Sequence, residues 1–335
     1  MRISNIVAIF RADRSAPTPV SPVKDPVSRL TAVSLYHSPI RLNTRSVSFT
    51  FSTINPDTRT HFHSHTLLID RPPYSADTES TMNQYLEVAI KAAHEAGKLL
   101  RANFERPLKV NAAEAHDIKL ELDVLSQELI TDLLLKRFPE HTILGEEGSA
   151  EPTNGEFEWV VDPIDGTVNY YYGIPHYCIS IALRQKQQIL IGVIYDPTRD
   201  ELWQVERGGK SYLNERVIES SNRTDLAECV VSVGMSKSSS EVEVALQIFQ
   251  TMISRARKCR MMGSAALDLA YVATGRYDAY IERSVNWWDI AAGVLLVQQA
   301  GGKLLISPSK VAEGKLSVIA WNGKLDEKDL TQAYP

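Results

Sequence analysis

The sequence predicts a mixed α/β fold for the region after residue 81. One observation is a set of long stretches in which apolar residues recur at helical spacing, as in 83–104. Another is a series of short apolar or alternating runs between turn residues, concentrated in 176–206, which is typical of antiparallel strands. With 335 residues, the chain is long enough for one large domain or two medium ones with a sizeable core.

The composition is that of a soluble globular protein, with 44% hydrophobic and 23% charged residues. The net charge of −5 gives no support to nucleic-acid binding driven by phosphate contacts. No apolar run approaches the roughly 20 residues of a membrane span. The 3 cysteines lack CxxC spacing, which argues against a disulfide framework or a zinc site. We therefore expect a cytoplasmic protein that binds neither nucleic acid nor membrane.

Residues 1–81 differ from the rest of the chain. They are rich in Ser, Thr, Pro and Arg and show no sustained helical or strand period. One interpretation is an organellar targeting segment, which is typically Arg- and Ser-rich and poor in acidic residues. The other, which we favour, is an extension upstream of a true start at Met82. Under both interpretations we expect disorder and no catalytic role in 1–81, and a folded domain over 82–335.

The elements of this domain follow in order from the same signals. A long helix over 83–104 is followed by Pro107, and a second helix opens at Asp123 and closes at Pro139. Turn residues then separate strands and helices to the end of the chain. The predicted strands are 143–145, 159–162, 177–183, 189–195, 201–205, 211–213, 216–218, 230–234, 277–282, 303–306 and 316–321, and the later helices are 243–254, 263–275 and 290–297.

The stretch from Trp159 to Asn169 indicates the chemistry. A buried apolar run leads into Asp162, and Asp165 follows on a predicted turn, directly before Gly166. Glycine lets backbone N–H groups approach an anion. Two carboxylates beside such a site would repel the anion unless divalent cations bound both. The stretch therefore predicts divalent metals that hold a phosphate.

Three further carboxylates stand at the ends of predicted elements, where α/β folds place functional groups. Asp123 and Asp289 stand at helix starts, and Glu146 follows a short strand. Taken singly, the two aspartates are capping carboxylates favoured by the helix dipole, and Glu146 is a solvated loop charge. Combined with Asp162 and Asp165, they make an oxygen-rich set suited to Mg²⁺.

Three motifs together resemble the inositol monophosphatase family, which belongs to the Mg²⁺-dependent, lithium-sensitive phosphatase superfamily. They are Gly145-Glu146-Glu147, Asp162-Pro163-Ile164-Asp165-Gly166-Thr167 and Trp288-Asp289-Ile290-Ala291-Ala292-Gly293. The resemblance extends from about Asn83 to Leu330. It implies an αβαβα five-layer sandwich of the inositol monophosphatase and fructose-1,6-bisphosphatase type. It also implies a homodimer that hydrolyses phosphate monoesters.

The resemblance further implies roles for individual residues. About two or three Mg²⁺ ions per site would bind Glu146, Asp162, the carbonyl oxygen of Ile164, Asp165 and Asp289. Glu146, helped by Thr167 and Asp123, would position and deprotonate the attacking water. The substrate would contact Asp165, Gly166, Thr167, Ala265 and Glu282. Residues 82–220 would thus carry the metals and the phosphate, and 221–335 the substrate side.

Inositol 1-phosphate is the expected substrate, because a carboxylate such as Glu282 accepts hydrogen bonds from vicinal hydroxyls. The blander interpretation of Glu282 is a surface charge at a strand end. The same mechanism on histidinol phosphate, fructose 1,6-bisphosphate or a 3′-phosphonucleotide stays open, as does a regulatory homologue without turnover. Val168 replaces a lysine common in the 3′-phosphonucleotide branch and argues against that substrate. Lys119 and Glu121 depart from the family's usual segment before Asp123.

Overall fold

The computed structural model describes residues 76–114, 117–149, 155–235 and 239–332, all within one compact unit. Helix α1 (Ala76–Asn103) begins earlier than the predicted start at residue 83. The expectation of disorder is therefore wrong for residues 76–81, which continue the helical turns of α1 toward the N-terminus. The rest of that expectation concerns residues 1–75, which lie outside the described residues. Across the described part of the chain, no helix combines the length and the apolar character that a membrane crossing requires.

Eight strands form the larger sheet, in the order β10-β9-β8-β7-β6-β5-β3-β4. Neighbouring strands are antiparallel except β3 and β5, which are parallel. The predicted antiparallel region is thus confirmed. The strands are β3 (Thr142–Gly145), β4 (Gly148–Ser149), β5 (Phe157–Asp165), β6 (Cys178–Gln185), β7 (Gln188–Asp196), β8 (Glu201–Glu206), β9 (Ser211–Leu213) and β10 (Arg216–Ile218).

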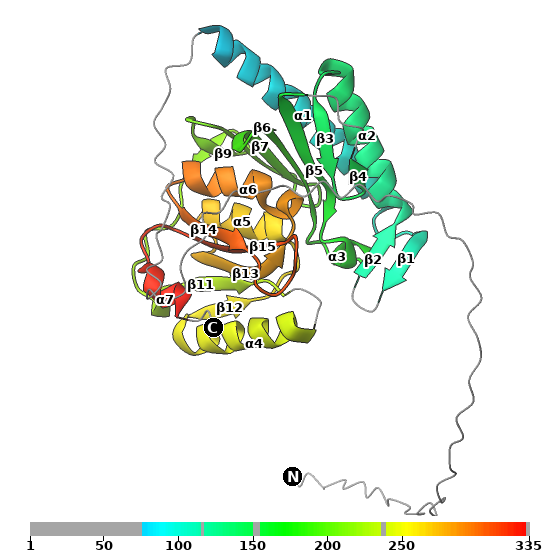
Figure 1. The fold of residues 1–335 in the computed structure, drawn as a ribbon. Coiled ribbons are helices and arrows are strands. Elements are labelled where there is room, and N and C mark those ends of the chain that lie inside the picture. Colours follow the sequence, from blue (N-terminus) through cyan, green and yellow to red (C-terminus); the bar gives the residue numbers. More distant parts are fainter. Residues whose placement is uncertain (1–75, 115–116, 150–154, 236–238, 333–335) are drawn as a thin grey trace, which may run out of the picture. The chain divides into compact units, whose positions relative to one another are not determined.

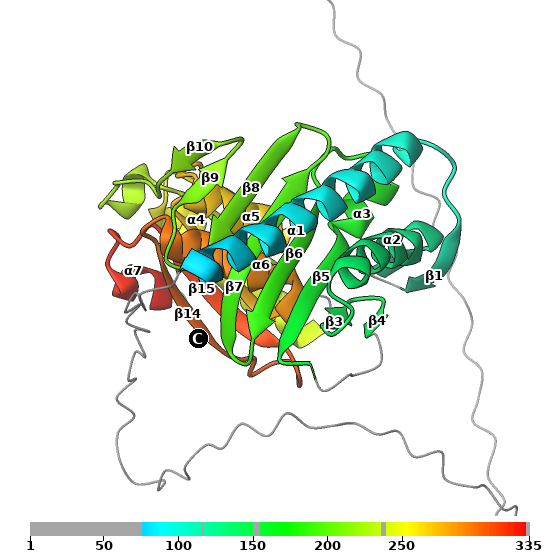
Figure 2. The same cartoon turned by 90° about the horizontal axis from the view of Figure 1, so that it is seen from above.

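Helices α1 and α2 (Glu121–Arg137) cover one face of this sheet (Figure 2). The buried stripe of α1 is rich in alanine, so the helix axis can approach the strands closely. A Cβ atom at Gly97 would lie 2.4 Å from the ring of Tyr195, so α1 meets β7 where only glycine fits. Trp159 and Ile164 of β5 are buried in the core beneath these helices.

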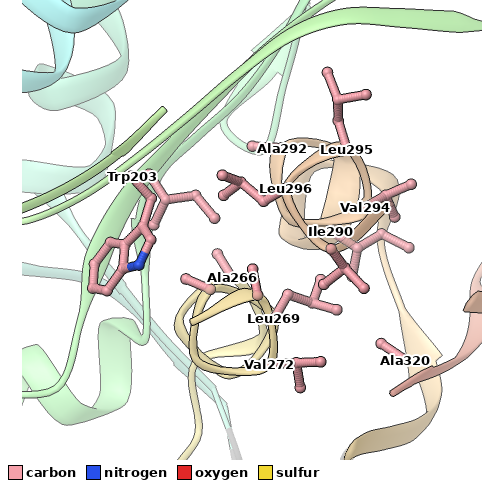
Figure 3. Close-up of a cluster of buried hydrophobic side chains, with 14 of the residues drawn as sticks. Trp203, Ala266, Leu269, Val272, Ile290, Ala292, Val294, Leu295, Leu296 and Ala320 are labelled. Atoms are coloured by element: carbon pink, nitrogen blue, oxygen red, sulfur yellow. The ribbon is translucent and has the colours of Figure 1, made fainter. Parts of the chain in front are cut away.

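Five strands form the second sheet, in the order β12-β11-β13-β15-β14. They are β11 (Val230–Val233), β12 (Lys258–Arg260), β13 (Ala279–Val285), β14 (Lys303–Pro308) and β15 (Leu316–Trp321). Helices α5 (Ala265–Ala273) and α6 (Trp287–Gln299) pack between the two sheets. Figure 3 shows the two helices in contact, with Trp203 of β8 on one side and Ala320 of β15 on the other. A Cβ at Gly293 would lie 2.5 Å from Leu269, so glycine permits this close approach.

Helix α4 (Ser239–Arg255) packs on the outer face of the second sheet, where Ile248 and Met252 contribute to the core. Helix, sheet, helix, sheet and helix layers thus follow one another (Figure 1), which confirms the predicted αβαβα sandwich. The remaining elements are β1 (Val110–Glu114), β2 (Asp117–Leu120), α3 (Thr167–Tyr171), a 3₁₀ turn (Leu226–Glu228) and α7 (Glu327–Thr331).

Candidate active site

The two aspartates of the central motif both lie at the end of β5, which continues to Asp165 instead of ending at Asp162. Pro163 has no N–H to donate to the ladder, and the register with β6 shifts between the two aspartates. This irregularity replaces the predicted turn. Asp162 Oδ1 accepts a hydrogen bond from the N–H of Ile164 at 3.0 Å. Both carboxylates are buried, at 2% and 8% exposure.

Asp165 is held by the N-terminus of α5, a helix that the sequence predicted, through a contact that it did not predict. Its Oδ2 atom accepts hydrogen bonds from Ser264 Oγ at 2.6 Å and from the Ala266 N–H at 2.7 Å. Ser264 is also the N-cap of α5. The first residue of α5 is Ala265, the predicted substrate contact. One oxygen of Asp165 therefore ties the metal motif to the predicted substrate side.

Gly166 and Thr167 begin the short helix α3. Gly166 has φ of 95°, a left-handed conformation, and a Cβ there would lie 3.0 Å from the carbonyl oxygen of His176. Thr167 Oγ1 lies 2.9 Å from the carbonyl oxygen of Ile164 and 3.4 Å from Asp123 Oδ1. A hydroxyl has one proton to donate, so it serves either the carbonyl or the carboxylate.

Asp123 lies in the first turn of α2, two residues after the start of that helix at Glu121. Its Oδ2 atom accepts the N–H of Leu120 at 2.6 Å, so the capping interpretation holds. Its Oδ1 atom faces Thr167, so the structure also brings together the two residues predicted to act as a pair.

Glu146 lies directly after β3, in a loop clamped by Gln127 of α2. Gln127 accepts the N–H of Glu147 and donates to the carbonyl of Gly148, both at 2.9 Å. A Cβ at Gly145 would lie 2.3 Å from the same amide, so the motif's glycine makes room for the clamp. Sequence reasoning missed Gln127, which carries no signal beyond its place in a helix.

Asp289 lies in the first turn of α6, and its Oδ2 atom accepts the N–H of Asn286 at 2.7 Å. Asp289 therefore caps α6, as the interpretation of this residue as a helix-capping carboxylate predicted. Glu282 lies on β13, and its carboxylate accepts a hydrogen bond from Tyr280. Asn169 of α3 donates to the carbonyls of His176 and Met262 at 2.9 and 2.8 Å, which links α3 to the loop before α5.

The departures from the usual motif before Asp123 form ion pairs. Lys119 lies 3.2 Å from Glu147, beside the predicted base. Lys109 lies 2.7 Å from Glu121, and both side chains are largely exposed. Exposed pairs of this kind contribute little to stability.

The family model described as the inositol monophosphatase family matches residues 81–334. The chain belongs to the inositol monophosphatase family. The Nus factor SuhB of Pseudomonas aeruginosa is 38% identical over 263 residues, which cover 76% of this chain and 97% of that protein. Family membership supports a phosphatase-type activity, and members generally use Mg²⁺. The name of this relative differs from the family name, so membership alone does not fix the substrate.

Solved structures of family members resemble the whole folded region. The extragenic suppressor protein suhB of Bartonella henselae has a TM-score of 0.67 and 34% identity, covering 72% of this chain and 94% of that one. The inositol monophosphatase of Anabaena has a TM-score of 0.63 and 32% identity, covering 76% and 95%.

The electrostatics of the inositol monophosphatase motif show an excess of negative charge. Burial raises the pKa of Glu146 to about 7, and the charges of Asp123 and Glu147 act in the same direction. Burial, assisted by the charge of Glu147, also raises the pKa of Asp123 to about 7. At neutral pH these two groups therefore lie close to their titration points.

The three aspartates predicted to bind metal behave in the same way. Burial raises the pKa of Asp165 to about 6, although Ser264 and the start of α5 donate hydrogen bonds to it. Burial raises the pKa of Asp162 well above its usual value, and so does the charge of Glu146. Burial raises the pKa of Asp289 well above its usual value, and the negative charge of Asp165 acts in the same direction. Cations within this group would favour the charged forms.

The donor set fits Mg²⁺ by chemistry, because every predicted ligand offers oxygen. In the described part of the chain, no three His, Cys, Asp or Glu side chains already converge as metal ligands. Asp289 and Asp165 each direct one carboxylate oxygen to an N–H group at a helix N-terminus, so each would offer its other oxygen to a metal.

Proposed function

We propose that this chain is a Mg²⁺-dependent phosphate monoester hydrolase whose substrate is inositol 1-phosphate. The observation that carries the proposal is the group of buried carboxylates, short of positive charge, around the Gly166–Thr167 turn. Membership of the inositol monophosphatase family supports the same reaction class.

In this proposal each residue has a distinct task. Bound Mg²⁺ would neutralise the phosphate charge and make water a better nucleophile. Glu146 would accept the proton of the attacking water. Thr167 Oγ1 lies closer to the Ile164 carbonyl, at 2.9 Å, than to Asp123, at 3.4 Å, and it would turn its proton to Asp123 so that the carbonyl is free as a ligand. The N–H groups of Gly166 and Thr167 bind phosphate oxygens.

The alcohol part of the substrate would contact Ala265 and Glu282. We propose a homodimer, as the resemblance implies, and a division into a metal half over 82–220 and a substrate half over 221–335. Histidinol phosphate, fructose 1,6-bisphosphate and a 3′-phosphonucleotide are the alternative substrates under the same mechanism.

Purified full-length protein with Mg²⁺ should release phosphate from inositol 1-phosphate, and Asp165→Asn should reduce kcat/KM by at least about a thousandfold. Asp326→Asn is a matched control, because this aspartate caps the distant helix α7 and should leave the rate unchanged. Turnover that survives both EDTA and Asp165→Asn would contradict the mechanism. A panel of the alternative esters, compared by kcat/KM, decides the substrate.

A second candidate is a Nus-factor role without need of turnover, favoured by the name of the SuhB relatives. Association with transcription complexes, measured for the wild type and for Asp165→Asn, tests it. Equal association of both proteins would support this role. Absence of association for both would exclude it.

A further inference from the structure

Glu282 lies at the edge of the acidic site, and two neighbouring residues restrict the position of its carboxylate. It lies on β13, and its carboxylate is close enough to Asp289 to raise the pKa of that group further. The side chain is only partly buried. What fixes the position of this carboxylate therefore bears on which alcohol the site accepts.

Tyr280 holds the carboxylate from one side. The two residues are two positions apart on β13, so their side chains point to the same face of the sheet. Tyr280 is fully buried, and its hydroxyl donates a hydrogen bond to Glu282 Oε2. Burial and the charge of Glu282 raise the pKa of this hydroxyl well above its usual value, so it keeps its proton and stays a donor.

Gly234 limits the carboxylate from another side. It follows β11, and its N–H donates to the carbonyl of Ile281 at 2.9 Å, which places its backbone beside Glu282. A Cβ at Gly234 would lie 1.8 Å from Glu282 Oε2 and 2.4 Å from its Cδ. Any side chain at residue 234 would therefore displace the carboxylate from its hydrogen bond with Tyr280.

We propose that Tyr280 and Gly234 together fix Glu282 in the position where it accepts hydrogen bonds from a hydroxyl of the substrate's alcohol. Tyr280 and Gly234 are positioning residues, because they act on the substrate through Glu282. The inference rests on the proposed function and deepens it: this pair sets the preference for phosphate esters of hydroxyl-bearing alcohols over esters that lack such a hydroxyl.

The test compares two esters with the full-length protein and Mg²⁺. Inositol 1-phosphate carries hydroxyls next to the ester carbon, whereas p-nitrophenyl phosphate carries none. Tyr280→Phe and Gly234→Ala should each raise KM for inositol 1-phosphate about five- to tenfold, with kcat changed less than about twofold, because one hydrogen bond to a charged group is weakened. Neither variant should alter KM for p-nitrophenyl phosphate.

Tyr277→Phe is the matched control, because it removes a hydroxyl from a nearby, largely buried tyrosine whose ring packs on Tyr271 at 5.2 Å. It should leave both esters unaffected. Crystal structures of Tyr280→Phe and Gly234→Ala should show a displaced Glu282 carboxylate, a readout that does not depend on activity.

The outcomes separate the two proposals. If the wild type hydrolyses neither ester, the proposed function fails and this inference with it. If it hydrolyses both and the variants change KM for both equally, or for neither, the inference alone is overturned. A Glu282 carboxylate unmoved in both variant structures would also overturn it.

Discussion

His176 gives a prediction whose magnitude follows directly from the structure. Its side chain is 2% exposed, and neither ring nitrogen has a hydrogen-bond partner among the described residues. Burial lowers the pKa of this imidazole to about 4, and the positive charge of Arg199 acts in the same direction. The folded state therefore binds a proton less readily than the unfolded chain, whose histidine has a pKa of about 6.5. Stability is lost as the pH falls below that value.

The size of the loss follows from the two pKa values. Proton linkage gives an expected loss of about 2–3 kcal/mol for this group between about pH 7 and pH 4.5. His176→Phe removes the titration and, since the ring nitrogens are unpartnered among the described residues, removes no hydrogen bond. At about pH 7 the larger ring should change the free energy of unfolding by less than about 1.5 kcal/mol in either direction.

Urea unfolding of both proteins, in EDTA and over about pH 4.5 to 7, measures the difference. The free energy of unfolding of the wild type should fall relative to His176→Phe by about 2–3 kcal/mol across this range. Carboxylates with raised pKa, such as those of the active site, change stability with the opposite sign but cancel in the comparison. Parallel pH profiles for the two proteins would refute the reasoning.

Three further predictions concern the active site. Gln127→Leu should lower kcat about tenfold at nearly constant KM, because the loop carrying Glu146 loses its clamp; steady-state kinetics checks this. Gly166→Ala should lower the free energy of unfolding by about 1–2 kcal/mol in urea, because φ is 95°, whereas Gly209→Ala should cost less than about 1 kcal/mol. Mg²⁺ at about 100 times its Kd should stabilise the wild type by about 2.7 kcal/mol but not Asp162→Asn, as thermal unfolding will show. This stabilisation should shrink as the pH falls, because the carboxylates must lose protons to bind metal.

The long elements of the fold were predictable because each carries its own pattern. The apolar stripe of α1 repeats over many residues, and the apolar runs of β6 and β7 are long enough to be recognised as buried strands. The elements β1, β12, α3 and α7, with 5, 3, 5 and 5 residues, show no such period, and the sequence did not predict them. The equally short strands β9 and β10 were predicted from the turn residues around them. β12 in particular is a strand through its parallel pairing with β11, which the sequence of β12 alone does not show.

The candidate site likewise contains residues that a local sequence pattern reveals and residues that it does not. Its candidate carboxylates could be proposed from the sequence because they lie in recognisable motifs, and the structure brings Asp123 to Thr167 across 44 residues. The supporting contacts could not be found, because each joins residues that no local pattern relates. Gln127 reaches the loop of Glu146 from another element, and Gly234 reaches Glu282 from a neighbouring strand.

In the proposed mechanism, the hydrogen bonds between Asp165 and the start of α5 would connect the part of the site that binds metal with the part that contacts the alcohol. Ser264 and Ala266, the partners of Asp165, lie 99 and 101 residues away in the sequence, on either side of Ala265. Any movement of Asp165 toward a metal therefore pulls on the backbone that would contact the alcohol. Ser264→Ala removes the side-chain half of this link and leaves the Ala266 N–H in place. It should therefore weaken inositol 1-phosphate binding and Mg²⁺ binding together, whereas Tyr280→Phe should weaken only the first.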